Sequence, residues 1–116
     1  FDSQIKEGKP CTIFNDGNQR RDFVHVDDVV DANILVATHK NKFGGEQYNI
    51  GTGKSISVNE IVDLLGGEKS YGTTVIEPFE TLSCTAKIDL DLDWKSKRSF
   101  SDWISEYKEN LGLWNY

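Results

Sequence analysis

Methionine is absent from this sequence of 116 residues, and no uninterrupted apolar run comes near the ~20 residues that a membrane-spanning helix needs. Without a start residue, we expect the chain to be a piece of a longer protein. It also lacks a basic-then-apolar N-terminal signal, so we predict no membrane partner. A hydrophobic content of 37% and a mean hydropathy of -0.51 predict one globular domain with a core of its own.

Basic residues are scarce, because 13 Lys and Arg stand against 19 Asp and Glu and leave a net charge of -6. Proteins that bind nucleic acid usually carry a basic face, so the sequence predicts no nucleic-acid partner. One or two local arginines are still enough to hold a small phosphate ligand.

Cysteine is also rare, and Cys11 and Cys84 lie far apart in the chain. A disulfide between them stays open, but two isolated cysteines without a secretory signal favour free thiols in a reducing cytoplasm. Together with His25 and His39 they show no metal-ligand spacing. We therefore predict a cytoplasmic protein without a metal site.

Helical and strand patterns alternate along the chain, and this alternation predicts an α/β fold in which short strands alternate with three to four helices. The predicted helices cover residues 1–8, 27–40, 57–65 and 99–111, with a capping box at Ser57 and Glu60 and a stop at Gly112. The predicted strands cover residues 11–14, 23–26, 47–50 and 73–76, and residues 83–88 are expected to pair nearby.

The most informative stretch runs from Arg20 to Ala32 and reads Arg-Arg-Asp-Phe-Val-His-Val-Asp-Asp-Val-Val-Asp-Ala. Two acids stand where the helix begins and complement the positive end of its dipole. A planar guanidinium binds a phosphate through two parallel hydrogen bonds, so Arg20 and Arg21 are candidate ligands of a diphosphate. The alternative is a solvated surface pair, or a salt bridge to Asp22 or Asp28.

This stretch resembles the RDFVYVDDVADA-type signature of the extended short-chain dehydrogenase/reductase family, which comprises nucleotide-sugar epimerases and dehydratases. Residues 48–58 resemble the family's YNIGTG…SV segment, and residues 92–100 resemble the LGWxPxxSL element before its final helix. Because these motifs follow in the family's order along nearly the whole chain, the sequence is identified as a member of the family.

The resemblance implies roles for individual residues. Arg21 matches the Arg of the family's RDF motif, which contacts the pyrophosphate of the sugar nucleotide, and Phe23 matches an aromatic residue beside the nucleotide. By the same resemblance Glu80 contacts the ribose or the sugar, and Arg20 is a second basic residue for the substrate. His25, which is usually Tyr or His in the family, is expected to be structural, and the turn at residues 51–53 is expected to be architectural.

The resemblance also implies what the chain is part of. Residues 1–116 correspond to the C-terminal, substrate-binding portion of an extended Rossmann-type epimerase. The N-terminal NAD-binding part is absent, because the sequence has neither the GxxGxxG loop nor the Tyr-x-x-x-Lys pair on which the family's chemistry depends. We therefore expect NAD or NADP in a full-length parent, no cofactor and no catalytic residue in this chain alone, and a nucleotide-diphosphate sugar as its ligand.

One departure from the family pattern bears on that ligand. Where many members have Arg-Pro-Gly-Asp/Glu, with the Arg as a second pyrophosphate clamp, this chain has Glu77 in the Arg position and Phe79 in the Gly position. A carboxylate that faces a diphosphate is repulsive. Three explanations stay open: the two stretches do not correspond, Arg20 or Lys87 replaces the lost charge, or this lineage no longer binds a sugar nucleotide in the usual way.

The sequence thus supports two functions. The first is the substrate-binding part of an NAD(P)-dependent sugar-nucleotide epimerase or dehydratase, inactive alone. The alternative is a truncated, non-catalytic relative that acts as a binding or assembly module. In either case, unpaired edges of the strands predicted at residues 23–26 and 47–50, and an uncovered face of the helix predicted at residues 27–40, would favour self-association.

Overall fold

The computed structural model describes residues 1–40 and 42–110, which form helices alternating with short strands. This alternation confirms the predicted α/β class. The elements in chain order are α1 (Asp2–Lys6), β1 (Cys11–Ile13), β2 (Arg20–Arg21), α2 (Val26–Thr38), β3 (Ile56–Ser57), α3 (Val58–Leu65), β4 (Lys69–Tyr71), α4 (Ala86–Leu92) and α5 (Phe100–Asn110).

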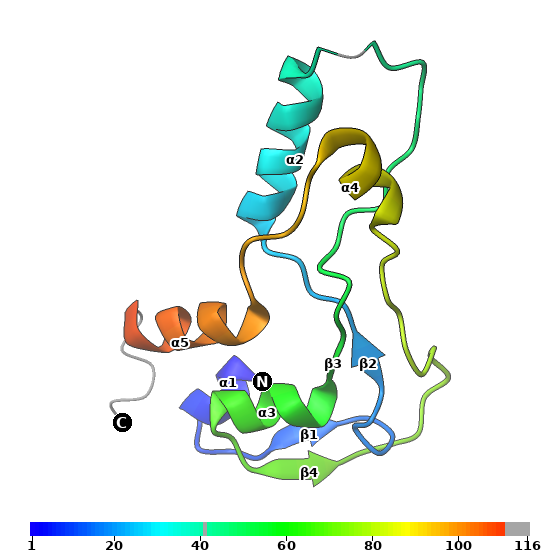
Figure 1. Cartoon of the computed structure of the whole chain (residues 1–116). Coiled ribbons are helices and arrows are strands. Elements are labelled where there is room, and N and C mark those ends of the chain that lie inside the picture. The colour runs from blue at the N-terminus through cyan, green and yellow to red at the C-terminus, as the bar shows by residue number, and fades with distance from the viewer. Residues whose placement is uncertain (41, 111–116) are drawn as a thin grey trace.

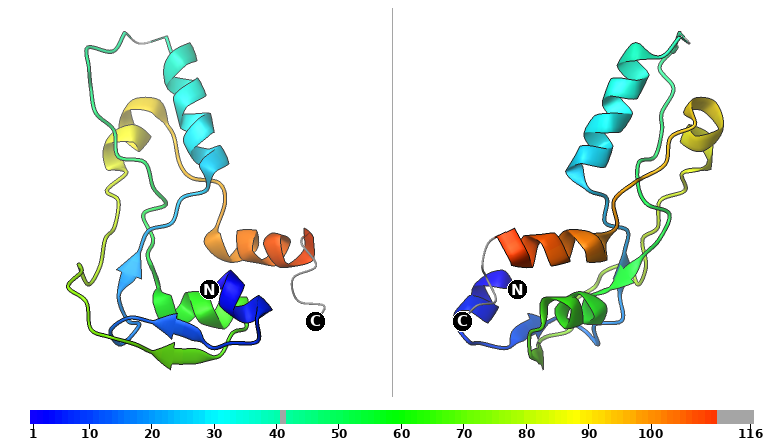
Figure 2. Two further views of the ribbon diagram at one scale, coloured as in Figure 1. Left: turned by 180° about the vertical axis from the view of Figure 1, so that it is seen from behind. Right: turned by 60° about the vertical axis from the view of Figure 1, so that its left-hand side comes forward.

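The molecule is elongated and thin, with dimensions of 52 × 34 × 17 Å and a radius of gyration of 17.3 Å. A compact domain of this length has a radius of gyration of about 13 Å. Figure 1 shows why: α1, α3, α5, β1 and β4 gather in a lower lobe, and α2 and α4 form an arm that rises from it. The rotated views in Figure 2 keep the arm clear of the lobe.

Two small sheets organise the lower lobe and its junction with the arm. In the first, β1 pairs in parallel with β4, with Cys11 opposite Lys69. In the second, β2 runs antiparallel to β3, with Arg20 opposite Ser57. Arg20 also bridges to Glu80 on its other side, so β2 lies between two segments that are distant in sequence.

The core is divided into three clusters that follow the same division. The arm is held by α2 and α4, whose Ala32, Ile88 and Leu92 pack with Trp94. In the lobe, β1 packs on α3 through its cysteine and isoleucine, and a third cluster joins α3 to α5 through Ile104. One apolar face of each of α2, α3 and α5 is therefore buried, but in separate small cores.

The predicted starts of α3 and α5 are confirmed. Ser57 and Glu60 form a reciprocal capping box at the start of α3, and Gly66 ends that helix in the left-handed conformation with φ 76°. The Ser99 hydroxyl accepts from the backbone of Asp102 at 3.2 Å, which caps α5 as predicted. The predicted end of α5 at Leu111 and Gly112 lies outside the described residues.

The strands predicted at residues 23–26 and 47–50 are wrong. The strand β2 ends at Arg21, residues 22–25 are not in a ladder, and α2 begins one residue earlier than predicted, at Val26. Residues 47–50 likewise form no strand. Both segments have strand-like composition, but neither meets a neighbouring strand within the described residues, and a ladder needs a partner.

The predictions for residues 73–76 and 83–88 are wrong as well. The ladder with β1 is formed by Lys69–Tyr71 instead, and beyond it the Asn15 side chain accepts from the backbone of Val75 at 3.0 Å. A side chain thus takes the place of a strand partner. Residues 83–88 lead into α4, which turns Ile88 and Leu92 into the arm's core and brings the described helices to five.

Both cysteines are free thiols, as the sequence favoured. Cys11 is buried in the lobe and Cys84 is exposed. Burial raises the pKa of the Cys11 thiol, which makes it less reactive than an exposed cysteine. A cytoplasmic location stays a prediction.

Candidate functional site

Arg20 is held by protein groups on every side of its guanidinium. Its Nε donates to the Ser55 hydroxyl at 3.0 Å, one terminal nitrogen donates to the Ser55 carbonyl at 2.7 Å, and the other lies 3.4 Å from Glu60. Glu80 accepts from the same Ser55 hydroxyl and lies 3.8 Å from Arg20. The structure therefore brings together Arg20 and Glu80, two predicted substrate residues, and gives Arg20 partners other than the predicted Asp22 or Asp28.

Arg21 faces a different carboxylate. One terminal nitrogen donates to Glu77 Oε2 at 2.9 Å, and the other donates to the carbonyl of Arg20 at 2.7 Å. The side chains of Arg21 and Glu77 are only 25% and 30% exposed. Glu77 therefore does lie beside Arg21, the predicted diphosphate ligand. Lys87 donates to the Gln47 carbonyl at 2.8 Å in the arm, so it does not replace the positive charge that is lost at position 77.

Phe23 begins a ladder of four aromatic rings. It stacks on Phe100 at 4.8 Å between ring centroids, Phe100 lies 5.9 Å from Trp103, and Trp103 stacks on Tyr107 at 5.0 Å. The last three rings come from one face of α5. Offset stacking of this kind adds stability beyond the buried area, so Phe23 is fixed in place by α5 while it stays 39% exposed.

Two cavities meet at Phe23 and Phe100. The larger has a volume of about 680 Å³, a size in the usual range for ligand pockets. Its charged lining consists of Lys54, Lys95, Lys97, Arg98, Glu60 and Asp89, which leaves an excess of two positive charges in a chain whose net charge is -6. Of the residues that the sequence predicted for the site, Phe23 lines this cavity. Ser55 and Glu60, which hold Arg20, line it as well.

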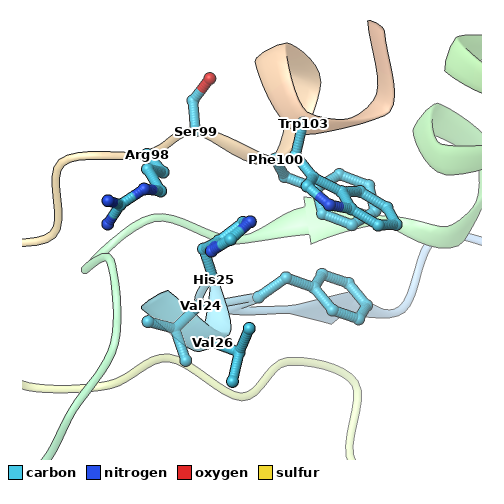
Figure 3. A pocket seen from close by; sticks show the side chains of 8 residues that line it. Val24, His25, Val26, Arg98, Ser99, Phe100 and Trp103 are labelled. Carbon is cyan, nitrogen blue, oxygen red and sulfur yellow. The ribbon is translucent and has the colours of Figure 1, made fainter. Parts of the chain in front are cut away.

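The smaller cavity, of about 230 Å³, lies under the ladder. Figure 3 shows Phe100 and Trp103 of α5 on one side of it, with His25 and Arg98 across from them. The His25 Nδ1 accepts from the backbone of Asp27 at 3.0 Å and thereby caps α2. This contact confirms the structural interpretation of His25.

Asp28 was named from the sequence only as an alternative partner of Arg20 or Arg21, so its role in holding Lys97 and Arg98 was missed. It is 1% exposed, and it accepts from the backbone nitrogens of Lys97 and Arg98, both at 3.1 Å, and from the Arg98 guanidinium. The hydrogen bonds that Arg98 donates to Asp31 and Asp28 raise the pKa of its guanidinium. The available signal was helical spacing, because Asp28 lies one turn before the buried Ala32 and so on the same face of α2.

Asp22 has a role in the turn at residues 51–53 that the sequence analysis also missed. Its carboxylate accepts from the backbone and hydroxyl of Thr52, at 3.0 and 2.6 Å, and from the Gly53 nitrogen at 3.0 Å. A Cβ on Gly51 would come within 2.4 Å of Ser83 and 2.8 Å of Asp22. The turn at residues 51–53 is therefore architectural, as predicted, and glycine is needed there because of close packing.

Neither metal binding nor membrane crossing is supported by what the structure describes. Over residues 1–40 and 42–110, no group of three His, Cys, Asp or Glu side chains is arranged to hold a metal ion. No helix in those ranges is long and apolar enough to span a membrane.

Comparison with known proteins places these features in a family. A sequence model of the NAD dependent epimerase/dehydratase family matches residues 2–51. The UDP-glucuronate 4-epimerase of Thermodesulfobacterium geofontis is 41% identical over 117 aligned positions, which cover 97% of this chain and 34% of that protein. The chain belongs to the NAD-dependent epimerase/dehydratase family.

Solved structures agree with this family and its fold. UDP-glucuronic acid 4-epimerase from Bacillus cereus, in complex with UDP-glucuronic acid and NAD, matches 95% of this epimerase-family chain with a TM-score of 0.80 and 29% identity, over 38% of its own length. UDP-glucose 4-epimerase from Thermotoga maritima, with UDP-glucose, matches 95% with a TM-score of 0.77 and 30% identity, again over 38%. The chain spans about a fifth to a third of the length of the curated relatives it matches first, 21% to 34%.

The described residues of this epimerase-family chain do not fit NAD, which the Bacillus cereus structure contains. A dinucleotide site needs a strand, a glycine loop that leaves room for the pyrophosphate, and a helix N-terminus. Here β1 and β4 continue into loops, and β3 enters α3 with no glycine between them. The space beside Gly17 is filled by Asn59, and the space beside Gly67 by the sulfur of Cys11. No chemical step is therefore assigned to NAD on this chain.

Proposed function

We propose that residues 1–116 are the substrate-binding portion of an NAD(P)-dependent sugar-nucleotide epimerase or dehydratase. The observation that carries this proposal is the match of 95% of the chain to epimerase structures that hold UDP-glucuronic acid or UDP-glucose. The ligand class is a nucleoside diphosphate sugar, and the nucleoside is uridine in both of those structures.

The binding residues act from one end of β2. Arg21 presents a planar guanidinium to the diphosphate, where it gives two parallel charge-assisted hydrogen bonds. Phe23, fixed by Phe100, flanks the nucleotide at the mouth of the cavity of about 680 Å³. Glu80 contacts the ribose or sugar hydroxyls through its carboxylate, and Arg20 orients Glu80 and Ser55 while it adds positive charge behind them.

Catalysis belongs to polypeptide outside these residues. The family's chemistry needs a bound nicotinamide and an acid-base pair, and neither motif is in this sequence. We propose that the NAD-binding part is N-terminal to residue 1 in the full-length protein, and that residues 1–116 alone bind substrate without turning it over.

Calorimetric titration of the 116-residue chain with UDP, GDP, dTDP and ADP tests this proposal. We expect one nucleotide to bind with a dissociation constant of about 1 mM or tighter, and Arg21→Ala to weaken it at least tenfold, a loss of about 1.4 kcal/mol. Lys9→Ala is the matched control, because Lys9 is an exposed cation paired with the exposed Glu7 at 2.7 Å. Equal affinity in wild type and Arg21→Ala, or no binding of any nucleotide, would overturn the assignment.

A second candidate function, assembly, is favoured by the surface of α2. Val26, Val30 and Ile34 follow one another at helical spacing and are 68%, 46% and 57% exposed. A run of apolar side chains along a whole helix is unusual on a free surface. Of the two surfaces that the sequence predicted for self-association, residues 23–26 and 47–50 form no strands and so offer no strand edges. We therefore propose that two copies associate through the other surface, the exposed face of α2.

A further inference from the structure

Glu77 uses both of its carboxylate oxygens inside the protein. Oε2 accepts from the terminal nitrogen of Arg21 at 2.9 Å, and Oε1 accepts from the Asn15 side chain at 3.0 Å. The side chains of Arg21 and Glu77 are both less than one-third exposed. The carboxylate is therefore clamped between a cation and a neutral donor, unlike a mobile surface glutamate.

Asn15 is itself fixed in a conformation that serves this clamp. Its φ of 56° lies in the left-handed region, which Asn tolerates better than most residues. Its backbone nitrogen donates to Thr73 and its side-chain oxygen accepts from Val75 at 3.0 Å. The segment that carries Glu77 is thus tied to the turn after β1 at several points, which holds the carboxylate in front of Arg21.

No other arginine of β2 is available in its place. The Nε and both terminal nitrogens of Arg20 already contact Ser55 or Glu60. One terminal nitrogen of Arg21 donates to the backbone carbonyl of Arg20 at 2.7 Å. The other terminal nitrogen donates to the Glu77 carboxylate, and this is the nitrogen that faces an anion. An incoming diphosphate that binds Arg21 meets a carboxylate already bound there.

We propose that Glu77 is an internal competitor for the substrate diphosphate: it occupies the anion-binding side of Arg21, and a nucleoside diphosphate binds by displacing it. The inference rests on the proposed function, because it assumes that Arg21 is the diphosphate ligand. Its consequence is specificity. Displacement breaks the ion pair between Arg21 and Glu77. A diphosphate compensates for this loss because it brings two or more negative charges to Arg21, whereas an uncharged nucleoside brings none.

The test is a comparison of UDP and uridine binding to the wild-type chain and to Glu77→Gln. Glutamine keeps an oxygen acceptor for Asn15 but removes the charge that competes for Arg21. Because a partly exposed charge pair is worth up to about 1 kcal/mol, we expect Glu77→Gln to bind UDP three- to fivefold more tightly. Uridine affinity should not change. Glu7→Gln is the matched control, since it removes the same charge from an exposed glutamate paired with Lys9.

A second variant separates release of the carboxylate from loss of its charge. Asn15→Gly keeps the left-handed backbone, which glycine adopts without strain, and removes the second clamp on Glu77. It should tighten UDP binding by a smaller factor than Glu77→Gln. This variant also tests the inference if Glu77→Gln does not fold.

The outcomes distinguish the inference from the function beneath it. If UDP binding is lost in Arg21→Ala but unchanged or weakened in both Glu77→Gln and Asn15→Gly, Glu77 is no competitor and the proposed function stands. If Glu7→Gln tightens UDP binding as much as Glu77→Gln, the effect is one of net charge and the inference fails. If neither the wild type nor Glu77→Gln binds any of UDP, GDP, dTDP and ADP, both proposals fall.

Discussion

The carboxylate of Asp28 joins the arm to the lobe, and its replacement by asparagine is the sharpest test of how the site is held. The side chain is 1% exposed and accepts two backbone hydrogen bonds from Lys97 and Arg98 and one from the Arg98 guanidinium. Asp28→Asn removes the charge and places an amide N–H group against the donors of Lys97 and Arg98, which need an acceptor. Hydrogen bonds to a charged group contribute about 1.5–3 kcal/mol each, and at least one is lost outright.

We therefore expect Asp28→Asn to lower the free energy of unfolding by about 2–3 kcal/mol. The estimate is at the lower end for a broken buried pair, because the Arg98 side chain is 39% exposed and can turn to water. Asp27→Asn is the matched control: it makes the same chemical change at the neighbouring position, where the side chain is 61% exposed. Its cost should stay within about 0.5 kcal/mol, as for most surface substitutions.

Urea unfolding followed by circular dichroism and by tryptophan fluorescence measures both variants. Trp103 lies in the ladder next to the segment that Asp28 holds, so its fluorescence should report the loosening before the helices unfold. If Asp28→Asn and Asp27→Asn differ by less than 0.5 kcal/mol (the usual size of a surface effect), the contacts of Asp28 do not hold the segment and the reasoning is wrong.

Two further predictions concern α3 and α2. Hydrogen bonds from Ser57 lower the pKa of Glu60, so its capping contribution is present above its ordinary pKa of about 4.3 and is lost as pH falls through the lowered folded value. Glu60→Gln should cost about 0.5 kcal/mol at pH 7 in urea unfolding, and this cost should shrink as the pH is lowered below about 4.3; a cost that does not fall with pH would contradict this. For α2, light scattering should show a mass that rises with concentration, and Val30→Lys should reduce the rise; a strictly monomeric wild type at high concentration would rule out association through this helix.

Local signals predicted the helices well because their causes are local. The capping box at Ser57 and Glu60 joins groups three residues apart, and Gly66 ends α3 by a conformation that glycine adopts without strain. The family's motifs are also local in sequence, which is why resemblance alone named Arg21 and Phe23 and pointed to Glu77 as a departure.

The strands and the electrostatic partners depended on tertiary structure. Residues 23–26 and 47–50 have the composition of strands, but a strand exists only where another segment supplies its hydrogen bonds. The partner of Arg21 is Glu77, which lies 56 residues away, and the partners of Asp28 lie 69 and 70 residues away. The sequence by itself therefore determined four of the five described helices, the caps of α3 and α5 and the candidate residues of β2, because those depend on neighbours along the chain, whereas α4 was not predicted. Only the tertiary structure decided which carboxylate faces which arginine, because charges pair by distance in space.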